Sequence, residues 1–302
     1  MPELLRVARA VATNQVARLA PGLYVRLTGQ TGRGDSDQES PEDIAAYFSQ
    51  CVADYLAFAG VPADQAPSYF AGKTVVEYGP GDFPGVALLM LAYGAHKVYA
   101  VDRFRMVRLT EKNVGVWKAL LASLHGEPRQ RALALLNNPQ VPADGFKREA
   151  IEYVVRPHGF SGLQQQADLV LSRAVLEHVD DLEGTFADML AALKPGGLAM
   201  HQVDLKSHGL HRDNPLDFLA WPAWLWSLMY SQKGVPNRWR IDRYRHILHA
   251  LPVQGRRLEP TLLASAADVA AVRNRLAAPF RELGDADLAC LGLWVGFSKP
   301  PG

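Results

Sequence analysis

Three glycines and two carboxylates lie in a short segment, Glu77–Gly85, whose sequence is EYGPGDFPG. The segment follows a run of β-favouring residues and precedes an apolar helical stretch, so we predict a loop between a strand and a helix. Glycines at such a position let the backbone come close to a ligand at the carboxyl edge of a parallel sheet. Asp102 ends the next predicted strand, 21 residues after Gly81, where an acid can accept hydrogen bonds from the two hydroxyls of a ribose. The pattern therefore indicates a nucleoside ligand.

The charges around this loop distinguish between two classes of nucleoside. A dinucleotide brings a diphosphate, which binds backbone N–H groups at a helix N-terminus, and Glu77 and Asp82 would repel it. S-Adenosylmethionine has no phosphate, and its ammonium and sulfonium groups are both cationic, so neighbouring carboxylates stabilise it. The loop therefore favours S-adenosylmethionine over NAD or a related dinucleotide. A structural role for Glu77, as a cap for the loop amides, is the alternative.

Histidines gather in the second half of the chain, where they are candidates for general bases. His201, Asp204, His208 and His211 lie in or just after one predicted strand, and His178 follows another. An imidazole titrates near neutral pH, and a carboxylate beside it can orient it. We predict His201, Asp204 and His178 as the catalytic residues, with a structural role for each histidine as the alternative. Three imidazoles spread along a loop do not define a coordination geometry, so no metal site is predicted.

Short apolar segments alternate with helical segments from Lys73 onward, which is typical of a parallel sheet with crossover helices. We predict strands at 74–78, 97–102, 151–155, 167–172, 198–203, 256–263 and 289–297, a turn at 194–197, and helices at 86–93, 104–135 (with breaks), 181–193 and 241–251. The expected fold class is α/β: a doubly wound, mostly parallel, seven-stranded sheet with a helical N-terminal segment and a helical insertion after the fifth strand.

Residues 1–72 are predicted to be a helical segment that forms a lid or packs against the rest of the chain. A first helix carries Leu5, Ala8, Ala12, Val16 and Leu19 at helical spacing and is expected to be a surface helix, with a membrane-surface or transit role as the alternative. An exposed loop follows at 29–41. Ser40 is then predicted to cap a second helix with Pro41 at its first position. The apolar side of that helix consists of Ile44, Phe48, Cys51, Tyr55 and Phe58.

Four motifs together resemble those of the class I S-adenosylmethionine-dependent methyltransferases. They are VVEYGPG (75–81), VD (101–102), AVLEHV (174–179) and LKPGG (193–197). The resemblance covers residues 73–205, and the last two predicted strands match loosely. It implies a Rossmann-like methyltransferase domain over residues 73–302, with S-adenosylmethionine as the cofactor and S-adenosylhomocysteine as its product.

The resemblance also implies roles for individual residues. The cofactor-binding set is Glu77, Gly79, Pro80, Gly81, Asp102, Arg103, Ser172 and Arg173. In the family, positions like Glu77, Gly79 and Gly81 line the methionine end, the acid at Asp102 holds the ribose, and Arg103 or Phe104 lies near the adenine. Ser172 and Arg173 are expected to face the sulfonium, but they do not form the Asn/Asp-Pro-Pro-Tyr sequence typical of nucleic-acid and protein amide N-methylation. The chain also departs from the family at 156–159, where RPHG stands in place of an acid for the adenine amino group.

Residues 207–239 extend beyond a minimal methyltransferase domain and are expected to cover the acceptor site. Within them we predict the substrate-binding residues Trp221, Trp224, Tyr230, Arg238 and Arg240. Aromatic side chains on one helix face can roof a small-molecule site, although simple packing is the alternative. The planar guanidinium groups can pair with a carboxylate or phosphate, which favours an acidic small molecule as the acceptor.

The composition excludes several other classes of protein. A net charge of +1 argues against a nucleic-acid partner. With only 2 cysteines there is no disulfide framework, so we expect a cytoplasmic protein. The longest aromatic-apolar run, 218–230, is shorter than the roughly 20 residues that span a bilayer, and arginines interrupt the N-terminal apolar stretches, so neither a membrane partner nor a signal peptide is expected. The oligomeric state is not indicated.

The function predicted from these observations is methyl transfer from S-adenosylmethionine to a small molecule. A hydroxyl acceptor, and hence O-methylation, is favoured because a His–Asp arrangement can remove its proton. The alternatives are N- or S-methylation of a small metabolite, a nucleotide-dependent oxidoreductase that uses the same glycine loop, and a methyltransferase-like protein that binds without catalysis.

Overall fold

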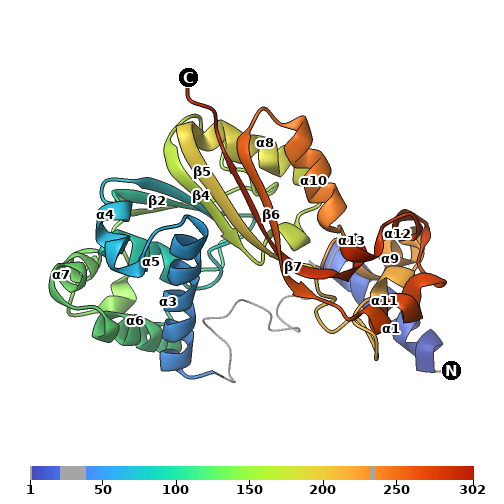
Figure 1. The fold of residues 1–302 in the computed structure, drawn as a ribbon. Helices are drawn as coiled ribbons and strands as arrows, with labels where there is room; N and C mark the ends of the chain where they lie inside the picture. The colour runs from blue at the N-terminus through green and yellow to red at the C-terminus, as the bar shows by residue number, and fades with distance from the viewer. Residues whose placement is uncertain (1, 21–38, 232–234) are drawn as a thin grey trace.

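Seven strands form one sheet in the computed structural model, which describes residues 2–20, 39–231 and 235–302 (Figure 1). The strands are β1 (Thr74–Tyr78), β2 (Lys97–Asp102), β3 (Ile151–Val155), β4 (Ala167–Arg173), β5 (Leu193–Asp204), β6 (Gln254–Leu263) and β7 (Cys290–Ser298). Their order in the sheet is β3-β2-β1-β4-β5-β7-β6. The first five strands run parallel to one another, and β7 runs antiparallel to both β5 and β6. The predicted doubly wound, mostly parallel sheet is confirmed.

The central strands are apolar on both faces, as expected for strands that helices cover on both sides. Val75 and Val76 in β1, and Leu169 and Val170 in β4, are all buried. The edge strand β6 is instead almost entirely exposed, and its charged side chains and Pro260 are typical of protected sheet edges.

The predicted turn at 194–197 is wrong in one respect, because these residues lie inside β5. Gly196 has a φ of 78°, and the pairing of β4 with β5 shifts its register between Ala167 and Leu169. The glycine-containing sequence therefore forms an irregularity at the start of the strand rather than a turn before it.

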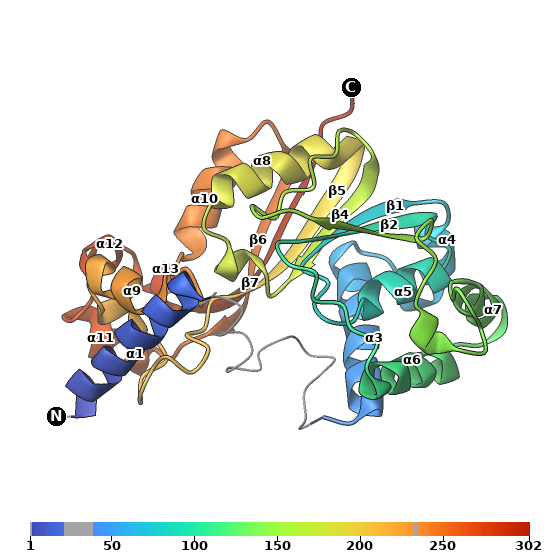
Figure 2. The same ribbon diagram turned by 180° about the vertical axis from the view of Figure 1, so that it is seen from behind.

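Helices cover both faces of the sheet (Figures 1 and 2). One face carries α3 (Pro41–Phe58), α4 (Ala66–Phe70), α5 (Gly85–Ala92), α6 (Glu111–Ser123) and α7 (Gly126–Ala134), and the other carries α8 (Leu182–Ala192) and α10 (Ile241–Ala250). Short 3₁₀ turns are η2 (Ala63–Gln65), η3 (Pro142–Asp144), η4 (Leu176–His178) and η5 (Asp217–Ala220). Each face has its own cluster of buried apolar side chains.

Helix α3 has the start and the buried side that the sequence predicts. Ser40 caps it in a capping box with Asp43, Pro41 is its first residue, and the predicted apolar side is buried against the sheet. The predicted loop at 29–41 lies outside the described residues up to position 38. No single described helix has the length and apolar character of a membrane span; α3 and the Ala63–Phe70 segment satisfy that test only as a pair, which is bent by 100°.

A third group of helices packs around its own apolar cluster, beside the ends of β6 and β7 near α13 (Figure 1). It consists of α1 (Pro2–Leu19), η5, α9 (Ala223–Tyr230), α11 (Ala266–Arg273), α12 (Ala278–Arg281) and α13 (Asp285–Ala289). The insertion after β5 thus packs with the N-terminal helix and with the segment between β6 and β7.

Helix α1 is present as predicted, but the face expected to be apolar is not the face that packs. Leu5 is 72% exposed and Leu19 is 81% exposed, whereas Ala10, Asn14 and Ala17 are buried. The amide of Asn14 donates to the backbone oxygen of Leu228 at 3.0 Å, and α1 lies against α9. Small residues and one polar side chain permit this close helix contact, so apolar periodicity alone selects the wrong side.

Candidate functional site

The glycine turn after β1 lies at the carboxyl edge of the parallel strands. Gly79 and Gly81 have φ angles of 67° and 73°, a backbone region that favours glycine. A Cβ on Gly79 would lie 2.3 Å from Val175, which follows β4, whereas a Cβ on Gly81 would meet no atom within 4 Å. The turn therefore packs against the segment after β4 on one side and has open space at Gly81. Pro80, between the two glycines, is buried.

Glu77 lies at the end of β1 with its side chain buried. Burial raises the pKa of this carboxyl group to about 8, although a hydrogen bond from the Ala87 backbone opposes the shift. Among the described residues, Oε2 of Glu77 has no hydrogen-bond partner. A buried carboxyl oxygen without a donor is rare in native proteins, and a cationic ligand would stabilise it.

Asp102 ends β2 at the same edge. Its Oδ1 accepts hydrogen bonds from the backbone N–H groups of Arg103 at 2.6 Å and of Phe104 at 3.3 Å. Burial raises its pKa above the ordinary value. These bonds fix the carboxyl group and leave Oδ2 as the oxygen that can accept from a ribose hydroxyl. Arg103 and Phe104 are exposed next to it, and Nε of Arg103 donates to the Pro157 oxygen at 3.2 Å.

Two tyrosines that the sequence analysis did not select lie near Glu77. Tyr55 comes from α3 and Tyr153 from β3, and burial followed by the charge of Glu77 raises the pKa of each phenol. The hydroxyl of Tyr153 is buried with no hydrogen-bond partner among the described residues. No sequence signal connects these residues to Glu77, because their proximity arises only from the packing of α3 and the order of the strands.

The structure places Ser172 and His201 in the protein core, which corrects two predictions. Both are completely buried, and Oγ of Ser172 lies 2.8 Å from Nδ1 of His201. The His201 ring lies between Phe186 and Phe297, with centroid distances of 5.9 and 6.2 Å. Burial lowers the pKa of this imidazole to about 3. Ser172 therefore does not face a sulfonium, and His201 has neither the access nor the basicity of a general base.

Arg173 points to the opposite face of the sheet, toward α3. Its guanidinium group forms an ion pair with Asp54 at 2.8 Å and lies 5.6 Å from the centre of the Tyr47 ring. This arginine is thus at the predicted edge but is held by a residue of α3. Its contact with the cofactor stays a prediction.

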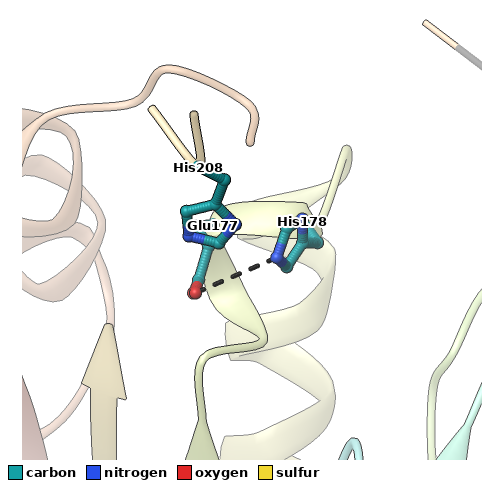
Figure 3. A group of neighbouring side chains, drawn as sticks. All are labelled: Glu177, His178 and His208. Carbon is teal, nitrogen blue, oxygen red and sulfur yellow. Dashed lines mark ion pairs between the residues drawn. The ribbon is translucent and has the colours of Figure 1, made fainter. Parts of the chain in front are cut away.

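Three polar side chains, those of Glu177, His178 and His208, meet where the segments after β4 and β5 come together (Figure 3). One ligand atom each from Glu177, His178 and His208 lies within 4.8 Å of the others, and the rings of His178 and His208 are 5.1 Å apart. Nε2 of His208 is also 3.6 Å from Oδ2 of Asp204. His208 thus lies between two of the predicted catalytic residues, His178 and Asp204. The third, His201, is not part of the group. Glu177 belongs to the AVLEHV motif, from which no catalytic role was predicted for it.

The charge states in this group are set by burial and by local bonds. Glu177 is 1% exposed, and burial raises its pKa to about 8. Although partial burial opposes it, hydrogen bonds from His208 and Lys206 lower the pKa of Asp204 to about 2. The side chains of His178 and His208 remain 31% and 33% exposed. Access to the group from solvent is therefore through the two imidazoles.

The predicted substrate-binding residues do not form one surface. Arg240 is 1% exposed and donates to the backbone oxygens of Leu205, Leu288 and Cys290. Arg238 donates to the Trp221 oxygen at 2.7 Å and lies over the ring of Trp226. Burial lowers the pKa of both arginines to about 10. Both guanidinium groups are therefore used inside the fold, which removes the basis for expecting an acidic acceptor.

The aromatic residues of the insertion divide between core and surface. Tyr230 is buried, with its ring 4.6 Å from that of Trp226. Trp221 is partly buried, and Trp224 is 69% exposed. The packing alternative thus describes Tyr230, and the role of Trp221 and Trp224 in substrate binding stays a prediction.

A comparison with models of protein families identifies the family of this chain. The family model described as a methyltransferase domain matches residues 50–251, which is more than half of the chain. No curated protein sequence matches. Similar solved structures include phosphoethanolamine N-methyltransferase 2 of Haemonchus contortus in complex with S-adenosyl-L-methionine, with 13% identity and a TM-score of 0.44 over 79% of this chain and 53% of that one. Another is an S-adenosylmethionine-dependent methyltransferase of Mesorhizobium loti, with 17% identity and a TM-score of 0.41 over 76% of this chain and 92% of that one. The chain thus spans about half the length of the first structure, and similarities at this level say nothing about the acceptor.

Proposed function

This chain belongs to the S-adenosylmethionine-dependent methyltransferases, and we propose that it transfers the methyl group to an oxygen of a small-molecule acceptor. The observation that carries the proposal is the buried carboxyl group of Glu77 beside the glycine turn, with an oxygen that has no partner among the described residues. A cationic donor compensates such a group, whereas a diphosphate does not. This argument favours the methyltransferase over the oxidoreductase alternative.

The residues at the edge of the sheet have distinct tasks. Glu77 binds the cationic methionine end, the backbone at Gly79 and Gly81 admits the ligand closely, and Asp102 holds the ribose through Oδ2. When bound, S-adenosylmethionine supplies the methyl group and leaves as S-adenosylhomocysteine. Because such a displacement has a good leaving group, the chain mainly aligns the donor with the acceptor.

A hydroxyl acceptor must also lose its proton. His178 and His208 are the accessible imidazoles at this edge, and Asp204 lies beside His208. We assign proton removal to the imidazoles of His178 and His208, with His178 as the predicted base, because His201 is enclosed in the core. N- or S-methylation is the alternative. A thiolate needs no base, so methylation of a thiol would be insensitive to replacement of these histidines.

Two measurements test the proposal. Isothermal titration with S-adenosylmethionine should show binding that Asp102→Ala weakens by about 1 to 3 kcal/mol, the value of a hydrogen bond to a charged group. A methyl-label transfer assay on pooled phenols, alcohols, carboxylic acids, amines and thiols should then give a labelled oxygen product. Binding of NAD or NADP without binding of S-adenosylmethionine would contradict the proposal, and donor binding with no transfer to any pool would favour the non-catalytic alternative.

A further inference from the structure

We propose that Glu177, His178 and His208 form a binding site for a divalent transition-metal ion at the acceptor side of the methyl-donor turn. The three side chains converge from two segments: Glu177 and His178 belong to η4 after β4, and His208 follows β5 (Figure 3). Two imidazoles and one carboxylate are a common ligand set for such ions.

Glu177 is the deepest member of the group and the strongest indication of a ligand. Its side chain is 1% exposed, and neither carboxyl oxygen has a hydrogen bond of normal geometry among the described residues, so the nearby backbone N–H groups of Glu177 and Asp204 compensate its burial only in part. A carboxyl group that is removed from water and only partly compensated by donors costs free energy. A bound cation would remove this cost, and the histidines beside it would complete the coordination.

The distances are close to those of a coordinated ion. Around a metal with bonds of about 2.1 Å in tetrahedral geometry, ligand atoms lie roughly 3.4 Å apart. Oε1 of Glu177 and Nε2 of His178 are 4.0 Å apart, and all three ligand atoms fall within 4.8 Å. Small rotations of the two imidazoles, which are about one-third exposed, would bring the three atoms to bonding distance.

The backbone that presents these ligands is held in place. The backbone N–H of Asn237 donates to the carbonyl oxygen of Glu177 at 2.6 Å. The side-chain amide of Asn237 donates to the backbone oxygens of Leu176 and Val179, each at 2.9 Å. On the other side, Asp204 lies against the imidazole of His208. Carboxylates in this position orient the imidazoles of metal sites.

The ligand set also selects the class of metal. Imidazoles suit zinc, iron, cobalt and nickel, whereas magnesium and calcium prefer oxygen ligands only. Three protein ligands leave coordination positions open for other groups.

The role of the ion rests on the proposed function. Val175, two residues before Glu177, packs against the turn at Gly79, so the site adjoins the donor turn. An open position would accept the acceptor's hydroxyl oxygen and lower its pKa. In the metal-bound protein His178 would be a ligand and would not act as the base. The hydroxyl proton would then leave to water, and the oxygen would form its bond to the methyl carbon as the carbon–sulfur bond breaks, with that electron pair staying on sulfur.

Titration of the full chain with Co²⁺ alone and with Zn²⁺ alone tests metal binding without any methyl acceptor. We expect one tight site per chain by calorimetry, with a Co²⁺ absorption spectrum that indicates imidazole ligands. Glu177→Gln, His178→Ala and His208→Asn should each weaken binding at least tenfold. Asparagine is chosen at position 208 because the φ of 49° there suits it. His125→Ala is the matched control, since His125 is exposed and lies outside the group.

A measurement on the wild-type protein tests the same site even if a variant fails to fold. Co²⁺ should broaden the imidazole NMR signals of His178 and His208 and leave that of His125 sharp. No binding, equal binding in all variants, or broadening elsewhere would overturn the inference. Titration with S-adenosylmethionine in metal-free buffer separates the two proposals: donor binding without metal binding refutes only the metal site, and metal binding without donor binding refutes only the proposed function.

Discussion

At the scale of single residues, Glu77 couples ligand binding to proton release. Its pKa of about 8 means that the carboxyl group is mostly protonated near neutral pH before a ligand binds. A cationic donor beside it favours the carboxylate, so affinity should rise with pH, by up to about tenfold per pH unit below that pKa, and then level off. Calorimetry with S-adenosylmethionine across this range, in buffers of different ionisation enthalpy, measures both the affinity and the released proton.

The matched control is Glu77→Gln, which keeps the shape and cannot ionise. The variant should show only the pH dependence that the donor's own amine contributes. Identical pH profiles for the two proteins would mean that Glu77 does not contact the cationic end of the ligand.

His201 leads to a prediction about stability rather than catalysis. Its pKa is lowered by burial from 6.5 to about 3, so the folded state binds fewer protons than the unfolded state between these values. The stability that the neutral ring contributes is present above pH 6.5 and is lost as the pH falls toward 3. The free energy of unfolding, measured with urea, should therefore decrease more steeply as the pH falls over this range for the wild type than for His201→Gln. Equal slopes would place the imidazole in contact with water.

The sequence predicts some site residues and misplaces others for a physical reason. Glu77, Gly79 and Asp102 follow strand ends, and strand ends of a parallel sheet always meet at one edge. Ser172 and His201 lie in strands that are buried on both faces. In such strands no polar–apolar alternation shows which face a side chain occupies, so the burial of these two could not be foreseen.

At the scale of elements, local signals decide what is predictable. The capped start of α3 and the apolar strands β1, β2 and β4 are encoded in adjacent residues. Two of the helices between β6 and β7 are too short to show a helical period, because α12 has 4 residues and α13 has 5. They belong to the same apolar cluster as α1 and α9, so tertiary packing rather than local propensity fixes their positions.

The turn η4 depends on one asparagine, which gives a prediction at this scale. The Asn237 amide donates to the carbonyl oxygens of Leu176 in η4 and of Val179 directly after it. Asn237→Ala removes both bonds and should cost about 1 to 3 kcal/mol of unfolding free energy. Chemical denaturation measures this change. Asn274→Ala, at an exposed helix end, should have little effect; an equal loss in the two variants would contradict the bracing role.

At the scale of the whole molecule, the chain has three apolar clusters, two against the sheet and one in the outlying helices. The third cluster joins the sheet where β5 ends and β7 begins, as Figures 1 and 2 show. Arg240 lies at this junction because it donates to three backbone oxygens there. Leu205 follows β5, Leu288 lies in α13, and Cys290 begins β7. One buried cation thus connects the catalytic sheet to the helices that the insertion contributes.

Replacing Arg240 should therefore affect the fold rather than the substrate. Arg240→Met leaves three buried carbonyl groups without a donor and should cost roughly 3 kcal/mol or more of unfolding free energy. Arg240→Lys should recover little of this, because an ammonium group cannot reproduce the planar fork that reaches several acceptors. Chemical denaturation should show a lower free energy of unfolding. The affinity for S-adenosylmethionine should fall only where the variant unfolds. A variant of normal stability with a raised KM for the acceptor would instead return Arg240 to the substrate site.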